Sequence, residues 1–464
     1  MKNLTLENIA KSCKGTYFGP QEALQKEVKG IAIDSRKMEK DWLFVATKGE
    51  RVDGHSFINQ VIENGATAVI SERKLADANF PYIVVEDSFV ALKQIAAFYR
   101  EQLDVKVVGI TGSVGKTSTK EMIASVLSTK YKVQKTQKNF NNEVGLPLTV
   151  FSISQEHEIA VLEMGISDFG EMTRLTHIAK PDVCVITNIG QCHLENLGNR
   201  DGVLKAKTEI FLGMKENGDV VLNGEDDKLL TVRTVAGKPV HYFAKEQTKE
   251  SEVYASNIVS RGLLGTNCTI HTPQGNIEVH IQMPGEHMVN NALTATVVGL
   301  LFNLTLEQMK EGIENAQTLA GRSHIIETEN YVVIDDCYNA NPVSMKAALD
   351  LLESANGRKV AIIGSMFELG ENEEQLHYDI GVYAAAKNID VIVALGQLGK
   401  NIHDGAKAAG HRAVYSFESV EEFLQQKDSI LNQKDTILVK ASHGMHLEKI
   451  VEVLSYEMLK NTKI

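Results

Sequence analysis

The sequence predicts an α/β protein with three domains: a small α/β domain, a central P-loop domain with a parallel sheet, and a C-terminal Rossmann-like, doubly wound domain. A glycine-rich segment at residues 111–118 lies between an apolar run of strand type and a segment with helical spacing of apolar residues. From about residue 318, apolar strands alternate with helical segments, which is typical of a doubly wound parallel sheet. We expect domain boundaries at 1–98, 99–317 and 318–464.

Composition excludes several classes of protein. The 464 residues are 43% apolar and 23% charged, with a net charge of −12 and no block of Lys and Arg, which argues against nucleic-acid binding. The sequence has no apolar stretch of about 18 residues, so no membrane span is expected. The N-terminus lacks the apolar core of a signal peptide. The five cysteines form no Cys-x-x-Cys pair, so we expect a reduced cytoplasmic protein without a zinc cage.

The glycine-rich segment has the order of a phosphate-binding loop: strand, loop, Gly-Lys-Thr, helix. Its residues are Thr111, Gly112, Ser113, Val114, Gly115, Lys116, Thr117 and Ser118. Lys116 is expected to reach the outer phosphates, and Thr117 to place its hydroxyl on Mg²⁺. The strict pattern has a glycine where Ile110 stands, so an ordinary glycine-rich turn is the alternative.

Polar residues follow the other strands expected in the central domain. Glu163 ends one strand, Asn141 and Asn142 lie in an amide-rich loop after another, and His193 follows a third. If these strands are parallel, all four residues lie at the sheet edge where α/β proteins bind ligands. Glu163 is then suited to hold a divalent cation together with Thr117, because hard cations prefer oxygen ligands. A solvated edge glutamate and a structural histidine are the alternatives.

Two polar turns follow strands of the first domain. From spacing alone, both are solvated turns. Their residues are Asp34, Ser35 and Arg36, and Asp53, Gly54 and His55.

Residues 240–283 are β-rich and irregular in pattern, with no recognisable chemistry. The helix that follows carries Asn291 in its first turn, where an amide is by default a cap. In the last domain, a strand ends at Asp336. This domain has no Gly-x-Gly-x-x-Gly, so a nicotinamide role is poorly supported.

Taken together, these segments resemble the Mur ligase family, which joins amino acids or peptides to UDP-muramoyl peptides. The resemblance spans all three domains. Segment 111–117 resembles the family's ATP loop, which also lacks the first glycine. Segment 162–165 is similar to the family's Mg²⁺-binding glutamate segment, and 187–195 to the segment whose histidine serves a second Mg²⁺. Lys207 aligns with a lysine that many members carbamoylate to N6-carboxylysine; from helix position alone it is a solvated lysine.

Four stretches resemble the members that add D-alanyl-D-alanine to UDP-N-acetylmuramoyl-tripeptide. They are 139–147, 336–342, 367–370 with His377, and 438–442. The resemblance also implies substrate contacts at Asp34, Ser35, Arg36, Asp53, Gly54, His55, Asn141, Asn142, Tyr338, Asn339 and Asn341. Met288, Ser365 and His443 depart from the family pattern, and with Met288 one amide is lost, so the nucleotide contact falls to Asn291.

The implied activity is that of an ATP-dependent ligase forming a C–N bond through an acyl phosphate, with ADP released. Lys116, Glu163, His193 and Lys207 are the expected catalytic residues, with two Mg²⁺ ions. Asn291, Arg322 and Asp336 are expected to contact ATP, the last two from the third domain. We expect a cytoplasmic monomer. The alternatives are folylpolyglutamate synthase, the tripeptide-forming Mur ligase, and an ATP-dependent switch that forms no bond.

Overall fold

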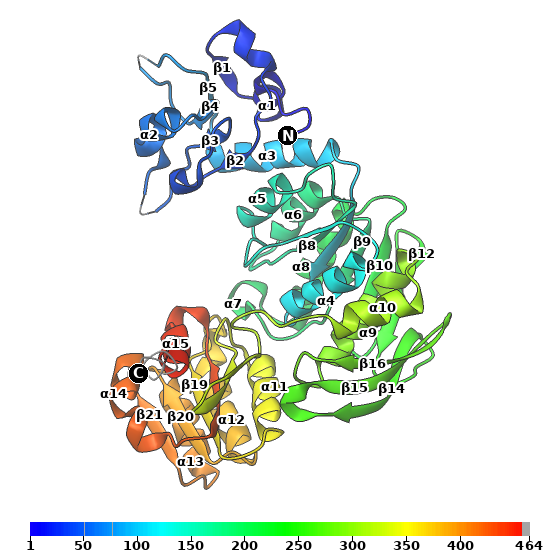
Figure 1. The fold of residues 1–464 in the computed structure, drawn as a ribbon, viewed down its shortest axis with the longest axis vertical. Helices are drawn as coiled ribbons and strands as arrows, with labels where there is room; N and C mark the ends of the chain where they lie inside the picture. Colours follow the sequence, from blue (N-terminus) through cyan, green and yellow to red (C-terminus); the bar gives the residue numbers. More distant parts are fainter. Residues whose placement is uncertain (51, 77, 457–464) are drawn as a thin grey trace. The chain divides into compact units, whose positions relative to one another are not determined.

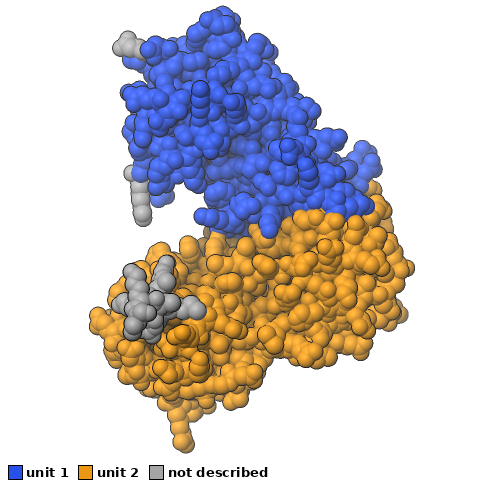
Figure 2. Space-filling model, viewed as in Figure 1, with its two compact units in different colours: residues 1–111, 130–185, 207–220 blue, residues 112–129, 186–206, 221–464 orange. Residues whose placement is uncertain are grey.

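The computed structural model describes residues 1–50, 52–76 and 78–456 and confirms the α/β class (Figure 1). The chain forms two compact units (Figure 2): residues 1–111, 130–185 and 207–220, and residues 112–129, 186–206 and 221–464. Among the described residues, no helix is long and apolar enough to cross a membrane.

The N-terminal sheet has five strands in the order β1-β5-β4-β3-β2. Only β1 runs antiparallel to its neighbour, and the other pairs are parallel. The strands are β1 (Thr16–Phe18), β2 (Ile31–Ala32), β3 (Leu43–Val45), β4 (Ala68–Ser71) and β5 (Tyr82–Val84), and the helices are α1 (Leu6–Ser12), α2 (Ile58–Glu63) and α3 (Ser88–Glu101). Thr5 caps α1, since its hydroxyl accepts a hydrogen bond from the backbone N–H of Asn8 at 3.2 Å.

A second sheet has nine strands in the order β16-β15-β14-β13-β10-β9-β6-β8-β7. Its strands are β6 (Lys106–Thr111), β7 (Val133–Lys135), β8 (Ile159–Glu163), β9 (Val183–Ile186), β10 (Asp219–Asn223), β13 (His241–Ala244), β14 (Ser251–Ser260), β15 (Thr266–Thr272) and β16 (Gly275–Ile281). As predicted, β8 is parallel to both β6 and β7. The short pair β11 (Thr234–Val235) and β12 (Lys238–Pro239) forms a separate ribbon.

The segment expected to be irregular at 240–283 extends this sheet in regular order. β14, β15 and β16 pair antiparallel through two successive connections. Buried residues alternate along the last two strands, at Cys268 and Ile270 and at Ile277 and Val279. This period of two is that of a sheet with one face covered.

The helices α4 (Lys116–Ser128), α9 (Met288–Leu301) and α10 (Leu306–Glu314) pack against one another. The contact between α4 and α10 is close because a Cβ on Gly312 would lie 2.3 Å from the Val126 Cα. The Ser125 hydroxyl also donates to the Gly312 carbonyl at 2.6 Å. The helix that begins at the glycine loop is therefore fixed along its far end. The remaining central helices are α5 (Gly145–Phe151), α6 (Glu171–Ala179), α7 (Leu194–Leu197) and α8 (Arg200–Thr208).

The C-terminal sheet has six strands in the order β17-β18-β22-β19-β20-β21, of which only β17 is antiparallel to its neighbour. Alternate residues feed two separate cores: Val360 and Ile362 pack into one, and Ala361 and Ile363 into the other. Apolar cores on both faces confirm the doubly wound sheet. The elements are β17 (His324–Glu327), β18 (Tyr331–Asp335), β19 (Lys359–Gly364), β20 (Val391–Leu395), β21 (Val414–Phe417), β22 (Asp435–Lys440), α11 (Pro342–Glu353), α12 (Glu373–Ala385), α13 (Gly399–Ala408), α14 (Val420–Ile430) and α15 (Glu448–Tyr456).

Candidate active site

The glycine loop leads directly into α4, whose first residue is Lys116. Gly115 is the N-cap with a φ of +79°, and a Cβ on Gly112 would lie 1.9 Å from the Thr187 Oγ1. Glycine is therefore required at both positions. The first backbone N–H groups of a helix of this length, with its dipole, favour an anion. Lys116 folds over the loop and donates from Nζ to the Gly112 carbonyl at 2.8 Å, so its ammonium lies against the glycine loop.

The loop is held by the segment that follows β9. Asn188 binds both backbone groups of Val114, accepting from its N–H and donating to its carbonyl, each at 3.0 Å. The Thr187 hydroxyl donates to the same carbonyl at 2.7 Å. These contacts fix the middle of the loop without using any of the N–H groups at the start of α4.

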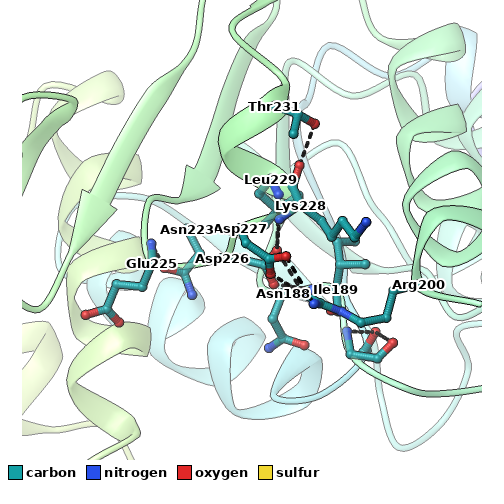
Figure 3. A network of polar contacts seen from close by, with 12 residues as sticks. Asn188, Ile189, Arg200, Asn223, Glu225, Asp226, Asp227, Lys228, Leu229 and Thr231 are labelled. Carbon is teal, nitrogen blue, oxygen red and sulfur yellow. Dashed lines mark hydrogen bonds and ion pairs between the residues drawn. The ribbon is translucent and has the colours of Figure 1, made fainter.

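A polar network holds this segment in turn (Figure 3). Asp226 accepts from the Ile189 N–H at 2.7 Å, and Arg200 donates from Nε to the Ile189 carbonyl at 2.8 Å. Asp226 also accepts from the backbone N–H groups of Lys228 and Leu229, which fixes its own turn. Asp226 and Arg200 are not among the residues predicted from the sequence. The acidic turn directly after the strand at 219–223 was the available signal.

Glu163 is the last residue of β8 and is 1% exposed. It pairs in register with Ile110, two residues before Gly112 in the chain. Asn141 donates to the Glu163 Oε1 at 2.8 Å, and the Glu163 N–H donates to the Thr136 hydroxyl at 2.9 Å. The structure thus brings together the amide-rich loop and Glu163, as the sequence predicted, and excludes the solvated alternative.

The other residues of the amide-rich loop hold its shape. Asn142 accepts from the N–H groups of Val144 and Gly145, at 3.2 and 2.8 Å, as a turn residue before α5. Glu143 pairs with Arg174 and Lys93, and the hydrogen bonds from Arg174 hold the pKa of Glu143 below its usual value. Glu143 is not among the residues predicted from the sequence to have a role.

Lys207 is 1% exposed, near the end of α8, and ranks among the largest fully buried side chains. Lys205, two residues earlier, is exposed. The solvated alternative for Lys207 is therefore wrong, because a buried lysine is uncommon without a specific role or partner.

His193 has a φ of +51° and stands as the N-cap residue of α7. Its Nδ1 lies 2.7 Å from the Glu368 Oε2. Among the described residues, no cluster of three or more His, Cys, Asp or Glu side chains has the arrangement of a metal site.

Asn291 lies against α4 in the described structure. Its Oδ1 accepts from the Thr119 hydroxyl at 2.9 Å, and its Nδ2 lies 3.1 Å from the Met288 sulfur. The departure at Met288 therefore supplies a soft acceptor that orients the Asn291 amide. The cap expected by default is not found, because the N-cap residue of α9 is His287 and no side chain caps the helix.

At the end of β18, Arg322 lies over the Tyr338 ring at 4.0 Å, and the His443 ring stacks on Tyr338 with 5.4 Å between centroids. Asp336 pairs with Lys440 at 2.6 Å and accepts from the Ser323 N–H. The structure brings these predicted residues together. Asn339 accepts from the N–H of Ala340, Asn341 caps α11 in a capping box with Ser344, and Ser365 is buried.

In the N-terminal unit, both predicted turns follow the parallel pair β2 and β3, so they share one sheet edge. Asp34 and Asp53 cap short turns, and a hydrogen bond from Arg36 lowers the pKa of Asp34 to about 2. Ser35 begins the first turn, and Gly54 begins the second. His55 is buried between Asp53, at 2.6 Å, and the backbone N–H of Glu72, at 3.0 Å.

The fold and the glycine loop define a phosphate-loop α/β protein. Three family models match it: "Mur ligase family, catalytic domain" over residues 27–106, "Mur ligase middle domain" over 110–299, and "Mur ligase, glutamate ligase domain" over 321–443. The chain belongs to the Mur ligase family.

Among its relatives, the UDP-N-acetylmuramoyl-tripeptide–D-alanyl-D-alanine ligase of Bacillus subtilis is 40% identical over 97% of this chain and 98% of the relative. A crystal structure of MurF from Acinetobacter baumannii has a TM-score of 0.88 at 35% identity, covering 97% and 98% of the two chains. MurF ligase from Thermotoga maritima, solved in complex with ADP, has a TM-score of 0.82 at 28% identity, covering 94% and 99%.

Proposed function

We propose that this chain is an ATP-dependent ligase that adds D-alanyl-D-alanine to UDP-N-acetylmuramoyl-tripeptide, the last cytoplasmic step in making the muramoyl pentapeptide of peptidoglycan. The observation that carries the proposal is the phosphate loop at the start of α4, in a chain that is similar over its whole length to ligases of that name. The likeness also favours this reading over a sister ligase or a bond-free switch. We propose that the enzyme acts as a monomer.

The reaction needs an activated acyl group, because a carboxylate does not react with an amine in water. The tripeptide carboxylate attacks the γ-phosphorus of ATP, and ADP leaves. The amine of D-alanyl-D-alanine then attacks the acyl carbon, and phosphate leaves from the tetrahedral intermediate. Anionic oxygens must approach one another in the first step, so cationic groups offset the repulsion.

We assign this stabilisation to the loop and to oxygen ligands. Lys116 contacts the γ-phosphate, and the N–H groups at the start of α4 contact the phosphates. Thr117 and Glu163 offer a hydroxyl and a carboxylate, the donor chemistry that suits Mg²⁺. When bound, Mg²⁺ neutralises charge on the phosphate oxygens.

His193 and Lys207 are the proposed ligands of a second Mg²⁺, which accompanies the substrate carboxylate. A carbamate on Lys207 would turn a cationic group into an anionic oxygen ligand, which suits a hard cation. The burial of Lys207 supports this role, because a solvated lysine is stable as an ammonium group without modification.

The remaining contacts follow the family resemblance. Asn291, Arg322 and Asp336 bind the nucleotide. The turns at 34–36 and 53–55 recognise the UDP group, and Asn141, Asn142, Tyr338, Asn339 and Asn341 contact the peptide substrates. With Arg322 and Asp336 on the third domain, closure of that domain completes the site and excludes water that would hydrolyse the acyl phosphate.

The test is phosphate release with a panel of UDP-muramoyl peptides, each with and without D-alanyl-D-alanine. We expect release only with the tripeptide and D-alanyl-D-alanine together, and its loss in Lys116→Ala. Release with a dipeptide or a folate acceptor would assign a sister ligase. Release that needs no acceptor would assign a switch. Near-normal release by Lys116→Ala would overturn the loop assignment.

A further inference from the structure

Two residues of unusual backbone conformation face each other within the compact unit of residues 112–129, 186–206 and 221–464. His193 and Glu368 have φ values of +51° and +63°, a left-handed region that non-glycine residues seldom occupy. Their side chains meet at 2.7 Å, His193 Nδ1 to Glu368 Oε2. Strained backbone of this kind persists where the surroundings hold it and gathers at functional sites.

The loop that carries Glu368 is fixed from beneath by buried groups. The Met366 N–H donates to the His377 Nε2 at 2.7 Å, and the Phe367 N–H donates to the Ser442 hydroxyl at 2.9 Å. His377 and Ser442 are 0% and 4% exposed. The carboxylate is therefore presented to His193 by a rigid support.

The contact determines which ring nitrogen of His193 carries the proton. A carboxylate accepts a hydrogen bond and cannot donate one, so Nδ1 bears a hydrogen, and in the neutral ring the lone pair then lies on Nε2. Histidine ligands of metals commonly have their other nitrogen bound to a carboxylate in this way.

We propose that Glu368 is a positioning residue that holds His193 in the tautomer whose Nε2 is available to a divalent cation. The proposal rests on the proposed role of His193 as a Mg²⁺ ligand. Glu368 lies in the segment matched by the glutamate ligase domain and His193 in that matched by the middle domain. Through this pair, the availability of the His193 Nε2 to a cation depends on the position of the third domain.

Stability does not explain the pair. The side chains of His193 and Glu368 are 25% and 62% exposed, and exposed ion pairs add little to folding. Glu368→Ala is therefore expected to fold. Glu371→Ala, an exposed acid on the same loop, is the matched control.

The first experiment reads the tautomer in metal-free, full-length protein. Side-chain ¹⁵N spectra of the histidines are recorded at a pH where imidazoles are neutral, and His193→Gln assigns the His193 signals. We expect a protonated Nδ1 in the wild type and in Glu371→Ala, and a shift towards the tautomer mixture of a solvated imidazole in Glu368→Ala. Unchanged His193 shifts in Glu368→Ala would overturn the proposal.

The second experiment separates this proposal from the assignment of His193 as a ligand. Mn²⁺ binding is measured by electron paramagnetic resonance with a non-hydrolysable ATP analogue and the UDP-linked tripeptide present. We expect weakening of about tenfold in Glu368→Ala, the lower end of what such partners contribute, with partial recovery in Glu368→Asp. Weakening in His193→Ala but not in Glu368→Ala would refute the positioning role alone. Unchanged binding in His193→Ala would refute the ligand assignment itself.

Discussion

Lys207 differs from its neighbour Lys205 in burial, although both lie on α8. A buried amine has lost its hydration, so it must be compensated by partners or by chemical change. The carbamate proposed for Lys207 is such a change, because it converts the cationic amine into a group that supplies anionic oxygen ligands.

Lys207→Ala should therefore lose most activity, and short carboxylates such as formate should restore part of it by occupying the place of the carbamate oxygens. Lys205→Ala, the control, should keep near-normal turnover and show no response to formate. Steady-state phosphate release measures both. An unmodified Lys207 in intact-mass data, together with no rescue, would refute the carbamate.

The roles of the site residues remain predictions, but the positions of some of them follow from a local signal. Glu163 and the amide-rich loop each follow an apolar strand, and parallel strands bring such ends to one edge, where Asn141 and Glu163 do meet. Asp226 and Glu368 were not found as site residues. Their partners, the Ile189 N–H and the His193 ring, are distant in the sequence, and sequence periodicity does not indicate which distant group a carboxylate will contact.

At the scale of the element, the phosphate loop depends on its neighbours. The segment after β9 binds Val114, and Asp226 holds that segment through the Ile189 N–H. The helix α4 begins at Lys116, three residues before the apolar spacing that predicts a helix. This spacing does not reveal the first turn, because the first turn carries polar residues.

Asp226→Ala should lower kcat/KM for ATP by about tenfold or more, because small displacements of catalytic groups cost large factors in rate. Asp227→Ala should have little effect, since Asp227 pairs only with the Arg200 side chain among the contacts described. Equal effects in the two variants would contradict a specific role for the Ile189 contact.

His377 supports the Glu368 loop as a neutral ring, with Nε2 accepting from Met366 and Nδ1 donating to the Glu373 carbonyl. Burial lowers the pKa of His377 below its ordinary 6.5. The unfolded chain then binds the proton more readily, so this contribution to stability is full above pH 6.5 and is lost as the pH falls through the lowered pKa.

His377→Gln should lower the free energy of unfolding by about 1–3 kcal/mol near neutral pH, the usual effect of a broken buried hydrogen bond. The difference in the free energy of unfolding between variant and wild type should become smaller in acid. Urea unfolding at a pH above and a pH below the histidine titration measures this difference. A difference that is independent of pH would contradict the claim that the His377 ring is neutral in the folded protein.

At the scale of the whole molecule, the α/β class was predictable because strand–helix alternation recurs along the chain, whereas the Mur ligase fold was implied by the resemblance of its motifs. The segment 240–283 was predicted to be β-rich, but its antiparallel pairing as β14–β16 was not predicted. Its alternation is interrupted by polar residues and by a register shift between Ser256 and Val259. The predicted domain boundaries remain a prediction.

We expect the third domain to close on the central one about a hinge near residues 316–322. Gly321, with a φ of +76°, lies in this segment, and its N–H donates to Asp335 at 2.7 Å. Small-angle scattering should show compaction when an ATP analogue and the UDP-linked tripeptide are added together. Superimposable profiles with and without them would contradict closure.

The central claim is that ATP activates the carboxylate of the tripeptide as an acyl phosphate. In that reaction one carboxylate oxygen leaves with the phosphate, so the tripeptide should be labelled with ¹⁸O at the carboxylate that is joined. With D-alanyl-D-alanine and ATP present, mass spectrometry should find one ¹⁸O atom in each phosphate released. Unlabelled phosphate, released together with the pentapeptide, would contradict the account.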